Sequence, residues 1–217
     1  MRTYPARLLK MAIDPAVRFI AVSNALKGRA VRFGMPQNKI DVSYIGVDTQ
    51  LFKPLGLPLD RRRRRILFVG RMVEKKAPLL LVEAFAALRT RMPDAELVMI
   101  GDGPLLPEVR KRANILGVPI TLPGPCGAKA VIEHLSRARV LCLPSVTATN
   151  GDAEGFPLVT LEAQACGVPV VTSALGAATE GVLDGVTGHS FPGGDRQAME
   201  HYLAMWLRND AMASAGS

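Results

Sequence analysis

From residue 66 onward, short apolar runs alternate with longer stretches whose apolar residues recur at helical spacing. This alternation predicts an α/β fold, in which a parallel sheet carries helices on both faces. The expected strands lie at 66–70, 96–100, 118–122, 140–143 and 168–172, with a weaker one at 189–191. The expected helices lie at 78–92, 128–137, 157–166 and 198–207, with another that ends at 117 after the turn at 101–104.

The first part of the chain is organised differently. The expected elements are a basic, partly helical lead-in at 1–17, strands at 18–23 and 41–46, and a helix at 24–33. The stretch that follows has the turn residues and the charge of an interdomain connector. We therefore expect two units, residues 1–54 and residues 55–217.

The composition favours a globular chain. With 217 residues and 48% hydrophobic content, the chain can bury one good core. No apolar run approaches the ~18 residues of a membrane span, and the start does not read as a signal peptide. The three cysteines (Cys126, Cys142 and Cys166) lack the spacing of a disulfide framework or a zinc site. A cytoplasmic location is therefore expected.

The net charge of +8 suggests an anionic partner, and the run 61–65 supplies much of it. Nucleic acid is disfavoured because the chain has one Trp and three Tyr, none of them interleaved with that run. An anionic membrane surface and a merely solvated basic linker remain as two interpretations of the run.

The segment that starts at Glu154 predicts a ligand site. Pro157 suits the first position of a helix and Gly167 suits the residue just past its end. Such a helix start offers free N–H groups to an anion, whereas the carboxylates of Glu154 and Glu162 suit hydroxyl groups. Phosphate and hydroxyls together describe a sugar nucleotide. The plainer alternative is that both acids are ordinary residues near a helix start.

A second candidate lies after the strand 66–70. In a parallel sheet, ligands bind outside the carboxyl ends of the strands. Arg71 and Lys76 stand at such an end, where the two cations can neutralise a diphosphate together. The alternative is solvated surface charge.

These motifs together carry a family resemblance. The segments involved are 21–23, 46–48, 52–54, 70–76, 101–104, 143–145, 154–163 and 166–171. In this order and spacing they resemble retaining glycosyltransferases of family 4, also called group 1, which have the GT-B fold. The likeness covers about residues 18–200, and it places residues 55–217 as the Rossmann-like donor half and residues 1–54 as the end of the acceptor domain.

The resemblance implies the role of each site residue. Arg71 and Lys76 hold the donor diphosphate and stabilise charge on the departing nucleotide, Glu154 faces the donor sugar, and Glu162 binds the ribose. Arg71, Lys76 and Glu154 are thus the expected catalytic residues. The expected donor-binding residues are Gly70, Arg71, Lys76, Gly124, Glu154, Gly155, Phe156, Pro157, Leu158 and Glu162.

The chain departs from the family pattern in three ways. Ala77 and Pro157 stand where the family usually or often has glycine, from which we expect altered loop geometry. Most of the acceptor domain has no counterpart, so we expect a fragment or a truncated product. The three histidines (His134, His189 and His201) do not match the family's histidine near the donor sugar, so we assign them no catalysis.

The expected function is transfer of a sugar from a UDP- or GDP-sugar to an unidentified acceptor with retention. Polysaccharide or glycolipid synthesis at the inner membrane face is the family's common setting. No metal or other cofactor is expected, because cationic side chains can neutralise the diphosphate. Asp152 also lacks a second acid with which to bind a divalent metal ion. The alternatives are an inactive module that only binds sugar nucleotide, a sugar-nucleotide epimerase of GT-B fold and, more distantly, a polyanion-binding protein.

Overall fold

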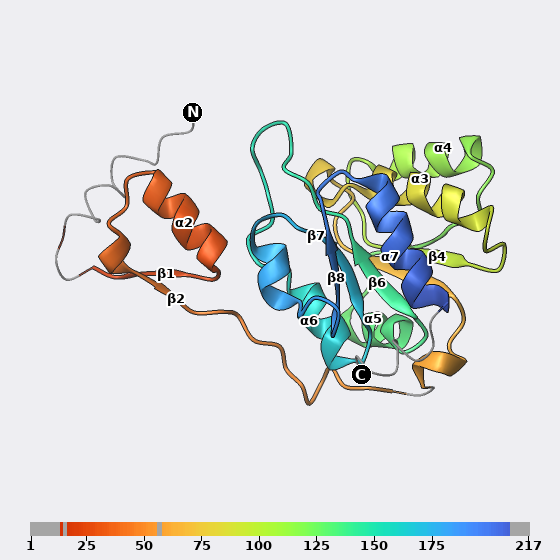
Figure 1. The fold of residues 1–217 in the computed structure, drawn as a ribbon, viewed down its shortest axis with the longest axis horizontal. Helices are drawn as coiled ribbons and strands as arrows, with labels where there is room; N and C mark the ends of the chain where they lie inside the picture. The colour runs from red at the N-terminus through yellow and green to blue at the C-terminus, as the bar shows by residue number, and fades with distance from the viewer. Residues whose placement is uncertain (1–13, 15–16, 56–57, 209–217) are drawn as a thin grey trace.

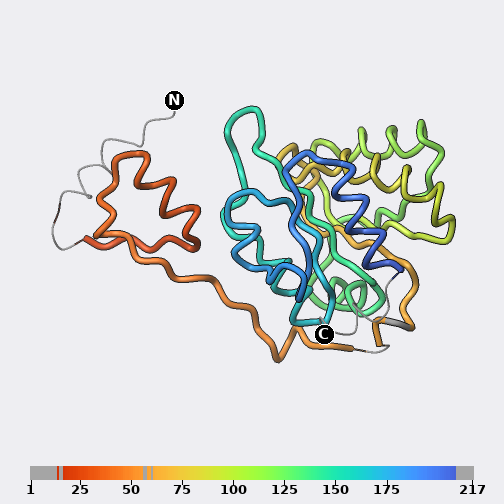
Figure 2. The backbone as a smooth tube through the Cα atoms, in the orientation of Figure 1, coloured from red at the N-terminus to blue at the C-terminus, as the bar shows by residue number. Residues whose placement is uncertain are grey.

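A computed structural model describes residue 14 and residues 17–55 and 58–208 of the chain (Figures 1 and 2). Most of the predicted basic lead-in, and everything after residue 208, lies outside the described residues. Two parts are visible, a small N-terminal unit and a larger α/β unit, joined by an extended connector. None of the described helices is both long and apolar enough to cross a membrane.

The N-terminal unit consists of two short parallel strands and one helix. Its elements are β1 (Phe19–Ala21), α2 (Asn24–Arg32), η1 (Gln37–Lys39) and β2 (Ile40–Val42). The helix begins where the sequence predicts, because Ser23 is its N-cap and accepts a hydrogen bond from the Leu26 amide at 3.1 Å. Both strands are shorter than predicted, and β2 begins one residue earlier.

Part of the arginine run 61–65 is structural rather than solvated. After η2 (Leu59–Arg61), the Arg62 side chain is buried and donates to the Leu135 and Ala138 carbonyls at 3.3 and 3.0 Å. Three further arginines form ion pairs, which are Arg63–Glu96, Arg64–Asp94 and Arg65–Glu96. The solvated-linker interpretation is therefore wrong for Arg62 and Arg65, whereas the Arg63 and Arg64 side chains are 78% and 42% exposed.

The larger unit contains six parallel strands in the order β5-β4-β3-β6-β7-β8. They are β3 (Arg65–Val69), β4 (Glu96–Ile100), β5 (Thr121–Gly124), β6 (Val140–Leu143), β7 (Val170–Ser173) and β8 (Gly188–Phe191). The predicted Rossmann-like parallel sheet is confirmed. β5 starts three residues late, because the Val118 amide still donates to Ala113 and so closes the preceding helix.

Helices cover both faces of this sheet (Figure 1). They are α3 (Pro78–Arg89), α4 (Leu106–Ile115), α5 (Ala128–Leu135), α6 (Leu158–Ala165) and α7 (Arg196–Arg208), with short turns η3 (Glu74–Lys76) and η4 (Gly176–Gly181). Alternate residues of β3 serve the two faces. Ile66 and Phe68 pack with α3, α4 and α7, whereas Leu67 packs with α5 and α6.

The start of α6 differs from the prediction by one residue. Pro157 is the N-cap, with ψ of 100°, and Leu158 is the first helical residue. The extended ψ lets the Pro157 carbonyl accept from both the amide and the hydroxyl of Thr160, at 3.1 and 2.7 Å. The end of the helix is as predicted, since Gly167 follows the C-cap with φ of +67°.

A buried histidine links the last helix to the edge strand. Trp206 Nε1 donates to Nδ1 of His189 at 3.1 Å, and the Tyr202 ring stacks on the same imidazole with centroids 4.6 Å apart. Burial lowers the pKa of His189 from its ordinary value, with Asp184 opposing the shift and His201 adding to it. The folded state therefore favours the neutral imidazole.

We expect stability to depend on this histidine between about pH 7 and pH 5. Because the pKa is lowered in the folded state, the unfolded chain takes up the proton first as the pH falls. His189 therefore costs stability as the pH drops below about 6.5, until the folded pKa is passed. Urea unfolding at pH 7.5 and 5.5 should show a smaller loss for His189→Asn than for the unsubstituted chain. His201→Asn, at an exposed position of α7, is the control: it removes only the smallest contribution to the His189 shift and should keep most of the loss.

Candidate functional site

The loop after β3 is tied by its backbone to the loop after β4. The Gly70 amide donates to the Ile100 carbonyl at 3.0 Å, and the Met72 amide donates to the Asp102 backbone carbonyl at 2.8 Å. In return, the Met72 carbonyl accepts from the Leu105 amide at 2.9 Å. The two loops therefore form one surface at the carboxyl end of the sheet.

Two glycines permit this close approach. Gly101 has φ of +133°, and a Cβ there would lie 2.0 Å from the Gly70 carbonyl oxygen. A Cβ on Gly103, with φ of +152°, would lie 2.6 Å from the Met72 oxygen. The sequence predicts the turn at 101–104 and includes it in the family resemblance, but it does not predict this contact, since a contact between two separate loops leaves no local pattern.

A first pocket of about 380 Å³ opens on this surface. Its lining is mostly apolar or glycine, and it comprises Val69, Gly70, Arg71, Ile100, Gly101, Asp102, Gly103, Pro125 and Cys126. The loop that follows Gly124 thus contributes two lining residues, although Gly124 itself is not among them. Instead, the Gly124 carbonyl accepts from the Gly101 amide at 3.0 Å.

A second pocket, of about 480 Å³, lies between η3 and the loop that leads to α6. Three basic residues (Arg71, Lys75 and Lys76) and three acidic residues (Glu74, Asp152 and Glu154) line it. Val73, Ala148 and Asn150 complete the lining. Arg71 is exposed and lines both pockets, so this residue lies where the two pockets adjoin.

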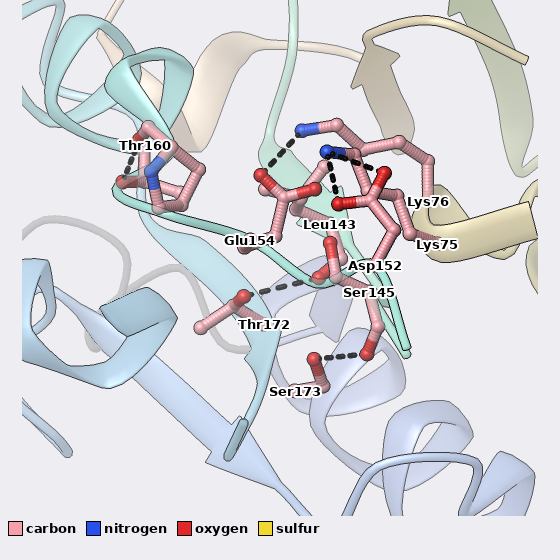
Figure 3. Close-up of polar contacts among 10 residues, drawn as sticks. Lys75, Lys76, Leu143, Ser145, Asp152, Glu154, Thr160, Thr172 and Ser173 are labelled. Atoms are coloured by element: carbon pink, nitrogen blue, oxygen red, sulfur yellow. Dashed lines mark hydrogen bonds and ion pairs between the residues drawn. The ribbon is translucent and has the colours of Figure 1, made fainter. Parts of the chain in front are cut away.

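An ion pair between Lys76 and Glu154 forms the inner wall of the second pocket (Figure 3). Lys76 Nζ lies 3.1 Å from Glu154 Oε2, and the two side chains are only 14% and 8% exposed. The other carboxylate oxygen, Glu154 Oε1, is buried and has no hydrogen-bond partner among the described residues. A buried acceptor without a donor is costly, so this oxygen is able to accept one further hydrogen bond.

The loop that carries Glu154 is held by η3. Lys75 pairs with Asp152 at 3.2 Å, as Figure 3 also shows. The Glu74 carboxylate accepts from the amide and the hydroxyl of Thr149, at 2.8 and 3.0 Å. Glu74 and Lys75 were missed as positioning residues, because their partners are more than seventy residues away in the sequence.

The remaining predicted site residues lie near the start of α6 but line neither pocket. Glu162 is half-buried, and burial raises the pKa of its carboxyl group from the ordinary value. The Gly155 carbonyl accepts from the Ser23 hydroxyl at 3.0 Å, and Phe156 packs on Tyr44. No side chain caps the first amides of α6, which begins at Leu158. The structure thus brings Arg71, Lys76 and Glu154 together and leaves the other residues beside them.

Among the described residues, no group of three or more His, Cys, Asp or Glu side chains is arranged to hold a metal ion. Asp152, the acid considered for such a role, pairs with Lys75 instead.

A family model described as Glycosyl transferases group 1 matches residues 63–209. The chain belongs to this family. A GDP-mannose-dependent alpha-(1-6)-phosphatidylinositol monomannoside mannosyltransferase of Mycolicibacterium smegmatis is 35% identical over 181 residues, covering 78% of this chain and 47% of that protein. The putative colanic acid biosynthesis glycosyltransferase WcaL of Salmonella typhimurium is 34% identical over 200 residues, covering 88% and 48%. The chain therefore spans about half the length of the curated relatives it matches.

A solved structure shares the fold of this chain. Anabaena HepE in complex with UDP superposes with a TM-score of 0.80 at 22% identity, covering 93% of this chain and 58% of that one. At this identity the likeness concerns the fold. The larger unit is thus the Rossmann-like half of a GT-B architecture.

The residue after η3 offers a test of loop strain. Ala77 has φ of +44°, and no other non-glycine residue in the described part of the chain has a positive φ. Because a side chain in this conformation costs about 1 kcal/mol, Ala77→Gly should raise the free energy of unfolding by up to about that amount. Ala204→Gly, within α7, is the control and should lower it by about 0.5–1 kcal/mol. Destabilisation by both substitutions in urea unfolding would contradict the assignment of strain.

The Lys76–Glu154 pair should be strongly coupled because it is buried. A double-mutant cycle with Lys76→Met and Glu154→Gln should give a coupling energy of about 1–3 kcal/mol in urea unfolding. The adjacent Lys75–Asp152 pair is a matched control with side chains 28% and 55% exposed. Lys75→Met and Asp152→Asn should couple by less than about 1 kcal/mol. Equal coupling energies in the two cycles would contradict the prediction that burial strengthens the Lys76–Glu154 pair.

Proposed function

We propose that this chain provides the donor-binding half of a retaining glycosyltransferase. The donor is a UDP- or GDP-sugar, and the reaction serves polysaccharide or glycolipid biosynthesis. The single observation that carries the proposal is the unpartnered Glu154 oxygen beside Lys76, in a charged pocket that adjoins an apolar one. Family membership and the names of the relatives support the same reaction class.

The two pockets suit the two ends of a sugar nucleotide. The first is walled by glycine backbone and apolar side chains, which accept the flat face of a base. The second has charges and hydrogen-bonding groups, which suit the sugar and its phosphates. Arg71 lines both pockets, and its guanidinium can bind the diphosphate that joins the nucleoside to the sugar.

Glu154 is proposed to bind the donor sugar. Its Oε1 accepts a hydrogen bond from a sugar hydroxyl, while Lys76 holds Oε2 and so fixes the direction of the carboxylate. Glu162, in the second turn of α6, is proposed to accept hydrogen bonds from the ribose hydroxyls. The backbone from Gly155 to Leu158 is proposed to contact the sugar and phosphate, with N–H groups from Gly155, Phe156 and Leu158 because Pro157 has none.

Arg71 and Lys76 are proposed to stabilise the negative charge that develops on the departing diphosphate, with the uncapped start of α6 adding its positive end. These groups are preorganised, because η3 and the loop up to Glu154 are joined by the contacts of Glu74 and Lys75. On this proposal no metal ion is needed for the leaving group.

The setting of the reaction is likewise part of the proposal. A lipid-linked saccharide or a polysaccharide is the proposed acceptor class, and the enzyme would work in the cytoplasm or at the inner face of the membrane. Because Arg62 and Arg65 are withdrawn from solvent, they are poor candidates for a membrane contact, whereas the exposed Arg63 and Arg64 remain able to make one.

Calorimetric titration of the chain with UDP, GDP and their sugar conjugates tests the donor site. We expect saturable binding that prefers one base. Arg71→Ala should weaken binding of the nucleoside diphosphate about tenfold or more, because a charge-assisted contact is lost. Glu162→Ala should weaken it as well, whereas Glu154→Gln should weaken only the sugar conjugate. Excess EDTA should leave the affinity unchanged.

Arg110→Ala is the control for Arg71, since Arg110 is an exposed arginine of α4 that lines neither pocket. It should leave the affinity unchanged. A folded chain that binds none of these ligands, or an equal effect of both arginine substitutions, would argue against the proposed site.

A further inference from the structure

A carboxylate of the larger unit caps the helix of the N-terminal unit. Glu180, in η4, accepts from the Asn24 and Ala25 amides at 2.8 Å each. It also accepts from the Tyr44 hydroxyl at 2.8 Å and from the Asn24 side chain at 3.2 Å. Both carboxylate oxygens are used, and the partners are more than 130 residues away in the sequence.

The position of Glu180 has a clear electrostatic reason. α2 has no acidic residue in its first turn, although negative charge there is favourable. Glu180 supplies this charge from the other unit and satisfies two amides at the helix start. These hydrogen bonds lower the pKa of Glu180 against the opposing effect of burial.

The same end of α2 contacts the loop that carries Glu154. Ser23, the N-cap, donates from its hydroxyl to the Gly155 carbonyl at 3.0 Å. Farther along the helix, Arg29 donates to the Gly151 carbonyl at 3.2 Å. The Tyr44 ring, bound to Glu180 through its hydroxyl, lies 5.4 Å from the Phe156 ring. Residues 151–156 are thus held along their length by the N-terminal unit.

We infer that Glu180 is a positioning residue, which docks the start of α2 on the larger unit and thereby orders the 151–156 loop for the donor sugar. Between β2 and η2 the described connector contains neither helix nor strand, so the two units meet through side-chain and loop contacts. Besides the contacts of Glu180, the buried Phe52 of the connector packs in one cluster with Leu67 of β3. The inference rests on the proposed function for its ligand, but the docking itself can be measured without any ligand.

Hydrogen exchange followed by mass spectrometry tests the docking on the ligand-free chain. Glu180→Ala should speed exchange about three- to tenfold in peptides that cover 23–32 and 151–158, because charged hydrogen bonds are lost at a partly exposed site. Exchange of β4 should stay unchanged. Glu180→Gln, which keeps one acceptor and the side-chain size, should give a smaller effect in the same peptides.

Asp41→Asn is the matched control. Asp41 forms an exposed ion pair with Arg18 within the N-terminal unit, at 2.9 Å, and this pair does not join the two units. The substitution should leave exchange at 151–158 unchanged. The inference is overturned if Glu180→Ala speeds exchange only in α2, speeds it in β4 as well, or has no effect.

Ligand binding separates positioning from simple stabilisation. Glu180→Ala should weaken binding of the sugar conjugate about threefold or more while leaving the affinity for the nucleoside diphosphate unchanged. Equal weakening of both ligands would overturn the link to the sugar. If the unsubstituted chain binds no nucleotide, the proposed function fails, and the exchange experiment still decides whether Glu180 orders the loop.

Discussion

The parallel pairing of β3 with β6 is the constraint on which the candidate site depends. The register sets Ile66 beside Val140, so the two strands end at the same edge of the sheet. The loop after β3 carries Lys76 and the loop after β6 carries Glu154, and the two side chains meet there at 3.1 Å. With antiparallel pairing, these loops would leave opposite edges and the ion pair could not form.

The chemistry of the site follows from how its charges are shared. The second pocket has equal numbers of cationic and anionic side chains, but they are not equally engaged. Lys75 and Lys76 are each paired with an acid, whereas Arg71 is exposed where the two pockets adjoin. The paired charges keep the loops in place, and Arg71 together with Glu154 Oε1 is left for the donor that we propose.

The loop 146–156 is shaped from two sides. Glu74 and Lys75 hold its first half through Thr149 and Asp152, and the N-terminal unit holds its second half through contacts such as Ser23 with Gly155. A long loop without regular structure pays a conformational cost when it is ordered, and these contacts offset that cost. The geometry of Glu154 is thus a property of both units.

The sequence by itself predicted the sheet and its helices, because apolar periodicity is a local signal. It also indicated Arg71, Lys76 and Glu154 from their positions at strand ends and before a helix, and the structure places all three around one pocket. The predicted start of α6 was one residue early. Only the tertiary structure decided that part of the arginine run is bound to the larger unit and that Glu180 caps α2. Such contacts join residues far apart in the chain, and their energy depends on burial and direction, which no local pattern encodes.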